Sequence, residues 1–269
     1  MTGTRRPARI RRTAYRDYII NITNKKTYPT TMVKFVDDEL RAIRTEVLDM
    51  WTLVYEQMKN VCQALQTVDK DKAWEVLVRE KKVNASELKL DCDIEDFLVL
   101  YNPVAVDMRF IVAMLKINTD LERIGDFAEN IARFIIRQDG QPIDAALMER
   151  TRLMEMADAV LDMLLTAKIA LEKEDISMAN SLFEKDNLVD EINAAATQAL
   201  AEYIAQQPDK AAFCLDFKGI FLRLERTGDH ITNLAEEIIF YIDAVVLKHS
   251  AKKDATVQTM TRHIQESHE

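Results

Sequence analysis

Apolar residues recur with a helical period along most of the chain, from about residue 37 to residue 247. The clearest stretch has six apolar positions spaced by four and three residues in turn: Ile117, Leu121, Ile124, Ala128, Ile131 and Ile135. Such spacing places all of them on one face of a helix. The chain has only five Gly and five Pro, too few for the many tight turns of a β-rich protein. We therefore predict an all-α fold.

Caps and breaks along the chain predict six helices. Asp69 is a candidate N-cap for the second helix, and Asn102 caps the third with Pro103 in its first helical position. The segment 139–142, Asp-Gly-Gln-Pro, is the clearest break, and Pro208 opens the last helix. The predicted helices span residues 37–65, 70–101, 103–137, 143–171, 175–205 and 208–247.

The last helix on each side of this break carries a copy of one motif. Residues 121–132 read LERIGDFAENIA and residues 224–235 read LERTGDHITNLA, with seven of twelve positions identical. An internal repeat of this length is typical of a duplicated helical unit. We predict two tandem three-helix repeats, residues 32–138 and 143–248, followed by a polar tail at 249–269.

Charge is divided unevenly between the N-terminus and the rest of the chain. Residues 1–26 hold eight basic residues and one acid, a net charge of +7, and the remainder holds 28 basic and 44 acidic residues, a net charge of −16. An acidic body repels nucleic acid and anionic lipid, so we expect no nucleic-acid partner. Because Met32 lies just before the first helical pattern, residues 1–31 are expected to be a disordered or non-native leader. A nucleic-acid arm or a transit peptide is the alternative.

The cysteines and the apolar runs indicate the compartment. Cys62, Cys92 and Cys214 are scattered and form no Cys-x-x-Cys, which argues for a reducing compartment and against a disulfide framework. No apolar run in the sequence approaches the roughly 20 residues that a membrane-spanning helix needs. We predict a cytoplasmic protein without a membrane span.

Each copy of the motif stacks two carboxylates on one side of a helix. Glu122 and Asp126 are four residues apart, as are Glu225 and Asp229, and such pairs repel each other unless a cation neutralises them. A glycine lies inside each motif, where it costs about 1 kcal/mol relative to alanine. We predict that the acids lie opposite the apolar stripe, on a face that holds a ligand or packs on another element.

The preceding helix of each half offers matching oxygen ligands. Asp186 and Asp190 are four apart in the second half, and Glu80 and Asn84 take those places in the first half, with further acids at 87 and 91. Four or more carboxylate oxygens between two helices suit hard cations such as Mg²⁺, Mn²⁺, Ca²⁺ or ferric iron. The alternative is that these acids are ordinary solvated helix faces.

The doubled motif resembles the signature of the PhoU family, and residues 102–109, NPVAVDMR, resemble the segment that precedes it there. The resemblance covers residues 33–248. It implies two three-helix bundles related by a pseudo-twofold axis, with multinuclear iron or zinc clusters on the acidic faces. Where the family has an acid, this chain has Asn84, which weakens the first-half site. Carried over by position, the metal ligands are Glu80, Glu122, Asp126, Asp186, Asp190, Glu225 and Asp229.

The resemblance also implies a function. It predicts a negative regulator of phosphate uptake and phosphate-starvation signalling, which contacts the phosphate ABC transporter and a sensor histidine kinase. We expect a homodimer that reaches the membrane only through these partners. The alternatives are a carboxylate-bridged metal-binding protein, either a metal store or a di-metal enzyme, and a helical scaffold without metal. Di-metal bundles normally show Glu-x-x-His, whereas Gly125 and Gly228 occupy the histidine positions here.

The remaining polar residues near the motifs have simpler explanations. His230 is expected to be packed or solvent-facing, because Phe127 takes its place in the other copy. Arg109, Arg123 and Arg226 are expected to pair with the surrounding acids and not to bind phosphate. The sequence contains no Gly-rich phosphate loop and no nucleophile–base arrangement. We therefore predict that the protein is not an enzyme.

Overall fold

The computed structural model describes residues 30–103, 105–138 and 142–243. The chain divides into a short N-terminal unit that ends at Glu39 and a large unit that begins at Leu40, and the packing below concerns the large unit. Every regular element among the described residues is a helix, so the predicted all-α class is confirmed. Residues 1–29 of the predicted leader, the break at 139–141, the helix end at Leu247 and the tail at 249–269 lie outside the described residues.

The first two helices are α2, Thr30–Thr67, and α3, Lys70–Tyr101. Helix α2 begins before the predicted start at Asp37, because neither proline nor glycine interrupts the chain between them. The predicted N-cap is confirmed, since the Asp69 side chain accepts a hydrogen bond from the Lys72 backbone N–H at 3.0 Å. Two tight reversals therefore confine α3, one before Asp69 and one after Tyr101.

The prediction that Asn102 caps the next helix is wrong. Asn102 adopts a left-handed conformation, with φ 44° and ψ 64°, and ends α3. Asparagine tolerates this region better than most residues, which is why it often stops a helix. The next helix, α4, spans Ala105–Arg137, so Pro103 precedes it and is not in its first turn.

The predicted fourth helix is two helices, α5 at Ala145–Arg150 and α6 at Leu153–Lys173. Arg152 interrupts it with a left-handed backbone, φ 54°. Its guanidinium donates to Glu155 and Glu191 at 2.6–2.7 Å, so tertiary ion pairs accompany the break. No glycine, proline or asparagine marks this position, and the sequence pattern therefore missed it.

The second repeat continues with α7, Ile176–Gln206, a 3-10 turn at Pro208–Lys210 and α8, Ala211–Asp243. Asp175 caps α7 by accepting from the backbone N–H groups of Ser177 and Met178. The predicted start and end of α7 are confirmed to within one residue. Pro208 opens the 3-10 turn and α8 follows it directly.

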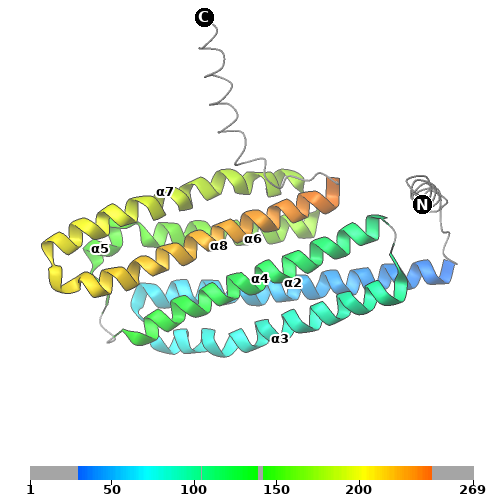
Figure 1. Ribbon diagram of the computed structural model, residues 1–269, viewed down its shortest axis with the longest axis horizontal. Coiled ribbons are helices and arrows are strands. Elements are labelled where there is room, and N and C mark those ends of the chain that lie inside the picture. Colours follow the sequence, from blue (N-terminus) through cyan, green and yellow to red (C-terminus); the bar gives the residue numbers. More distant parts are fainter. Residues whose placement is uncertain (1–29, 104, 139–141, 244–269) are drawn as a thin grey trace, which may run out of the picture. The chain divides into compact units, whose positions relative to one another are not determined.

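Helices α2, α3 and α4 form one bundle, and α6, α7 and α8 form the other (Figure 1). The six positions of the predicted apolar stripe in α4 are all buried, with at most 1% of their surface exposed. The predicted core face is therefore confirmed. The Trp51 indole N–H of α2 donates to the Leu164 carbonyl of α6 at 3.2 Å, which ties the two bundles together.

Helices α4 and α8 run antiparallel against each other along the contact between the repeats. Phe110 meets Tyr241 near one end and Phe134 meets Phe213 near the other. Phe127 and His230, which occupy equivalent positions of the two motif copies, contact each other at 5.5 Å between ring centroids. A self-contact of equivalent positions is what a twofold relation requires, and the predicted pairing of third and sixth helices is confirmed.

Two further expectations from the sequence concern disulfide bonds and membrane-spanning helices. All three cysteines are free, with Cys62 and Cys214 buried and Cys92 exposed. No helix in the described part of the chain is long and apolar enough to cross a membrane.

Candidate functional site

The first acidic site lies along the seam between α3 and α4 and consists of Glu80, Glu122 and Asp126. Glu80 projects from α3 and is only 4% exposed. Glu122 and Asp126 project from successive turns of α4, and both are partly exposed. One buried and two half-buried carboxylates therefore share this seam.

Glu80 is held by a buried side-chain amide from α2, the first helix of the bundle. Gln57 of α2 donates through its Nε2 to Glu80 Oε2, and the same nitrogen lies 3.4 Å from the Gly125 carbonyl oxygen. The other carboxylate oxygen, Oε1, is buried without a hydrogen-bond partner. Since burying an unsatisfied carboxylate is costly, the second oxygen of Glu80 is available to a proton or a cation.

Burial is the main cause that raises the pKa of Glu80 to about 7. The hydrogen bond from Gln57 opposes this shift, and the negative charges of Asp126, Glu129 and Glu122 contribute to it. Burial and the neighbouring Asp126 also raise the pKa of Glu122 above its ordinary value. Like-charged carboxylates in one seam disfavour each other's ionised form. The first acidic site therefore attracts positive charge.

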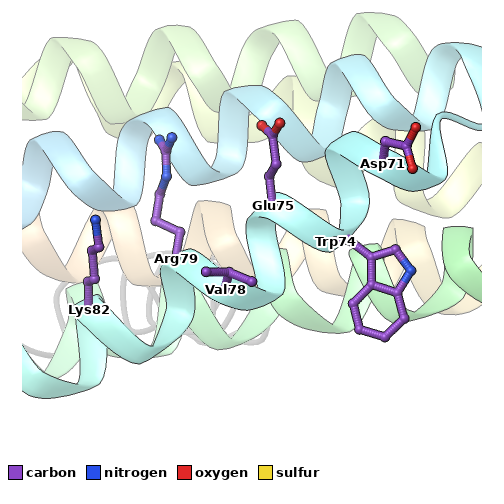
Figure 2. A pocket seen from close by; sticks show the side chains of 6 residues that line it. All are labelled: Asp71, Trp74, Glu75, Val78, Arg79 and Lys82. Atoms are coloured by element: carbon purple, nitrogen blue, oxygen red, sulfur yellow. The ribbon is translucent and has the colours of Figure 1, made fainter.

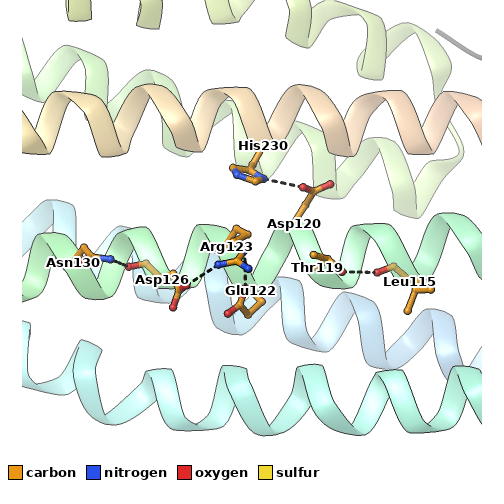
Figure 3. A network of polar contacts seen from close by, with 8 residues as sticks. All are labelled: Leu115, Thr119, Asp120, Glu122, Arg123, Asp126, Asn130 and His230. Atoms are coloured by element: carbon orange, nitrogen blue, oxygen red, sulfur yellow. Dashed lines mark hydrogen bonds and ion pairs between the residues drawn. The ribbon is translucent and has the colours of Figure 1, made fainter. Parts of the chain in front are cut away.

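Arg123 supplies part of that positive charge from the same helix (Figure 3). Its guanidinium lies 3.5 Å from Glu122 and 3.5 Å from Asp126. The expectation that Arg123 pairs with the surrounding acids is confirmed.

One turn before the site, the buried Asn118 donates to the Asp91 carboxylate at 2.9 Å and to the Glu87 carbonyl oxygen at 3.0 Å.

The second acidic site lies along the equivalent seam between α7 and α8 and consists of Asp186, Asp190, Glu225 and Asp229. Burial raises the pKa of Asp186 to about 7, with the charges of Asp190, Asp229 and Glu225 adding to the shift. Burial and Asp229 also raise the pKa of Asp190 and of Glu225. Asp186 Oδ1 is buried without a hydrogen-bond partner. All four predicted second-half residues are therefore close enough to influence each other's charge.

The two glycines of the motif make room for these inner acids. A Cβ added to Gly125 would lie 3.2 Å from Glu80 Oε2 and 3.2 Å from Val83 Cγ1. A Cβ added to Gly228 would lie 2.4 Å from Asp186 Oδ1. Each glycine thus lets a carboxylate of the neighbouring helix reach the backbone of the motif helix. This explains why both copies keep a residue that is unfavourable inside a helix.

The predicted direction of the acidic faces needs a correction. We expected Glu122 and Asp126 to lie opposite the core of their own bundle, yet both border α3 of that bundle and raise the pKa of its buried Glu80. The reason is the close approach of α3 at Gly125. Asn84, one turn beyond Glu80, is exposed, so the first seam lacks the second α3 acid that the family pattern has.

Sequence reasoning missed Gln57 and the role of His230. Gln57 is fully buried among the apolar positions Val54, Met58 and Val61 of α2, and a polar residue on an apolar stripe was the available signal. His230 is packed, as expected, but its Nδ1 also meets Asp120 Oδ1 at 2.8 Å, which bridges α8 to α4. That partner lies 110 residues away, and local spacing gives no sign of it.

The residues fit a hard cation by their chemistry. Every candidate ligand is a carboxylate, and each seam contains a buried carboxylate oxygen that lacks a partner, which is the donor set that oxygen-seeking cations prefer. Among the residues that the structure describes, no three acidic, histidine or cysteine side chains are already arranged to hold a metal ion. Binding would therefore require the outer acids of each seam to change rotamer.

The family model of the PhoU domain matches the chain twice, at residues 47–135 and 153–238. The first match contains the first acidic site and the second match contains the second. The two matched segments correspond to the bundles formed by α2–α4 and by α6–α8.

Proteins and structures similar to this chain carry the same family name. A phosphate-specific transport system accessory protein PhoU homolog from Burkholderia is 29% identical over 213 residues, covering 79% of this chain and 91% of that protein. A PhoU homolog from Thermotoga maritima is 29% identical over 202 residues, covering 75% of this chain and 86% of that protein. The crystal structure of PhoU from Pseudomonas aeruginosa superposes with a TM-score of 0.72 at 29% identity, covering 78% of this chain and 99% of that one.

Proposed function

The chain belongs to the PhoU family, and on that premise we propose that it is a negative regulator of phosphate uptake and phosphate-starvation signalling. Its relatives are named accessory proteins of the phosphate-specific transport system. The observation that carries the proposal is the double match of the family model, which includes both acidic seams. The protein acts by contact with the phosphate ABC transporter and with a sensor histidine kinase.

The acidic seams are the proposed contact surfaces, through bound metal ions. In the first seam Glu80, Glu122 and Asp126 hold the metal, and in the second seam Asp186, Asp190, Glu225 and Asp229 do so. Iron or zinc in multinuclear clusters is proposed, and Mg²⁺, Mn²⁺ and Ca²⁺ also suit carboxylate ligands. A bound cation would supply the positive charge that the unpartnered oxygens of Glu80 and Asp186 lack.

We place the protein in the cytoplasm as a homodimer, attached to the membrane through its partners. Reactive chemistry is not part of the proposal. The first described seam pairs its carboxylates with Arg123, arginine and lysine act on Glu225 of the second from a distance, and neither described seam shows a nucleophile beside a base. A di-metal enzyme is less well supported, since the residues three positions after Glu122 and Glu225 are the glycines that admit the inner acids.

The test is deletion of the gene in the organism that encodes this chain. In phosphate-rich medium, the deletion strain should take up phosphate faster and express its starvation genes, and the intact gene should reverse both effects. A gene with Glu122→Lys and Glu225→Lys together should fail to do so, because charge reversal on the seams repels a cation or a basic partner surface. A deletion strain whose uptake and expression match those of the parent would overturn the proposal.

A further inference from the structure

Helix α3 carries a second apolar face on its outer side. Its inner face is buried in the bundle through Ala73, Val76, Val83, Leu90, Ile94 and Phe97. On the outer side Trp74 is 54% exposed, Val78 and Leu88 are 63% exposed and Val99 is 82% exposed. A helix on the surface of a globular body is normally polar on its outer side, and a line of exposed large apolar side chains marks an interaction surface.

The exposed residues follow a seven-residue repeat. One series is Val78, Ala85, Cys92 and Val99, and the second, offset by three or four residues, is Trp74, Lys81, Leu88 and Glu95. All eight positions are exposed. We call them the outer stripe. Alternation of three and four along a helix is the seam of a coiled coil. From residue 74 to residue 99 this seam is about 38 Å long.

The two halves of α3 carry opposite charge. Residues 70–85 contain five basic and three acidic residues, and residues 86–101 contain one basic and five acidic residues. The ion pairs of α3 among the described residues are those of Lys89 with Glu46 and with Asp93. The basic residues Arg79, Lys81 and Lys82 thus have no acidic partner within the described chain.

We propose that the outer stripe is the surface on which two copies of this chain associate, with their α3 helices antiparallel. An antiparallel pair lays the basic half of each α3 on the acidic half of the other, whereas a parallel pair would place like charges together. The antiparallel arrangement also gives a closed twofold dimer, the commonest symmetry of soluble oligomers. The proposal rests on the homodimer of the proposed function and identifies the surface that forms it. Its experimental tests need only purified protein.

The register of the two α3 helices is the one in which the outer stripes of both copies overlap along their full length. Trp74 then faces Val99 of the second copy, Lys81 faces Cys92, and Ala85 faces Leu88 beside the twofold axis. A small residue at the crossing point allows the two helix backbones to approach closely. The charged positions Lys81 and Glu95 cost some stability within the seam and disfavour other registers.

A depression on α3 lies where the end of the partner helix would arrive. Asp71, Trp74, Glu75, Val78, Arg79 and Lys82 border an open volume of about 530 Å³. Figure 2 shows the polar side chains rising from one side of the helix and Trp74 projecting from another. The apolar floor suits Val99 of the second copy, and the basic rim suits the acids that precede Val99.

The first experiment measures self-association of the full chain by sedimentation at several concentrations. The unmodified protein is expected at twice the chain mass of 31.0 kDa. Val78→Glu with Leu88→Glu should weaken dimerisation at least a hundredfold. Leu215→Glu is the matched control, because Leu215 is 72% exposed on α8, and it should leave the dimer intact. A protein that is monomeric at every concentration, or equal behaviour of both variants, would overturn the proposal.

The second experiment tests the register without disturbing the apolar stripe. Lys81→Cys, mildly oxidised, should form an inter-chain disulfide to Cys92 that peptide mass spectrometry identifies. Glu184→Cys, at an exposed position of α7, should form no such link. A disulfide joining Cys92 to Cys92 in the unmodified chain, or no link from position 81 to position 92, would refute antiparallel pairing on this face. Both readouts use purified protein, so their failure leaves the phosphate-regulation proposal to its own test.

Discussion

The two acidic sites share one backbone design but differ in how their inner acid is held. In both, a glycine of the motif helix admits a carboxylate from the preceding helix. Each inner acid has one buried oxygen without a hydrogen-bond partner. The other oxygen of Glu80 accepts from the buried Gln57, whereas among the described residues no side-chain amide donates to Asp186. The two repeats therefore share the glycine that admits the inner carboxylate, but they differ in the groups that hold that carboxylate.

The two sites also differ in their number of acids and in the cations near them. The second site has acids at both 186 and 190, while the first has Glu80 followed by the exposed Asn84. In the first site Arg123 contacts both outer acids. In the second, Arg226 and Lys218 both lower the pKa of Glu225 from a distance. Lys218 itself is held by Asn193, and neither cation forms an ion pair with the four acids among the described residues. The second site is thus more negative and less neutralised, which favours a cation there.

Metal binding should show the largest difference between the sites. Asp229→Ala should lower the affinity for Mn²⁺ or Fe²⁺ on the order of a hundredfold, and Asp126→Ala on the order of tenfold. The reason is that the second site depends on its carboxylates, whereas the first is partly satisfied by Gln57 and Arg123. Titration calorimetry on protein purified without chelator measures both affinities. The variant that combines Asp126→Ala with Asp229→Ala should contain no iron or zinc by elemental analysis.

The control for these variants is Asp162→Ala, which removes an exposed carboxylate of α6 that pairs with Lys185. Its metal content should equal that of the unmodified protein. Equal losses from Asp126→Ala and Asp229→Ala would show that the two sites are equivalent. A double variant that keeps its full metal content would refute the ligand assignment altogether.

The two glycines should respond differently to alanine. Gly125→Ala should destabilise the protein by about 2 kcal/mol, because Glu80 is fixed by Gln57 and Val83 also lies in the way. Gly228→Ala should be nearly neutral, because the carboxylate of Asp186 is free to swing outward and alanine gains about 1 kcal/mol of helix propensity. Urea denaturation in the presence of chelator measures both free energies of unfolding. The reverse order of the two variants would contradict this account.

The sequence predicted the helical class and the duplication correctly, because both depend on local spacing. The second-half acids that it grouped lie close together, and their role as metal ligands stays a prediction. The stripe from Ile117 to Ile135 predicted the buried face of α4 correctly. What the pattern missed depends on tertiary contacts. The break at Arg152 accompanies ion pairs to Glu155 and Glu191. The buried contacts at Gly125 involve Gln57 and Glu80, which come from two other helices.

Stability should fall as pH rises, because of the inner acids. The folded-state pKa of Glu80 and of Asp186 is about 7, above their ordinary values of 4.5 and 3.8. Both acids are protonated below those ordinary values, so their contribution is complete there and is lost as pH rises through 7. The loss should be about 1 kcal/mol for each acid, allowing for screening by nearby water.

Urea denaturation at pH 5 and pH 8, with chelator present, tests this dependence. Asp186→Asn should remove most of its share, since nothing else holds that side chain. Glu80→Gln should remove its own share and keep an amide that can bond to Gln57. If both variants keep the full pH dependence of the unmodified protein, other groups are responsible for it.

The smallest expected effect is the most direct test of the comparison between the two sites. Asn84→Asp converts the Glu80-x-x-x-Asn84 pair of α3 into the acidic pair that α7 has at Asp186 and Asp190. Because Asn84 is exposed, the change should cost only about 0.2–0.5 kcal/mol of repulsion between carboxylates four residues apart.

The added carboxylate should raise the affinity of the first site for Mn²⁺ by about threefold, since ligand charge is one of the properties that tune such sites. Calorimetry is best done in the Asp229→Ala background, where the first site is measured without the second. Asn187→Asp is the matched control, because it adds the same charge to α7 at an exposed position beside the emptied site. A gain from Asn84→Asp alone would show that the missing α3 acid accounts for the weaker first site. An equal gain from both variants would mean that net charge, and not a fourth ligand at residue 84, sets the affinity.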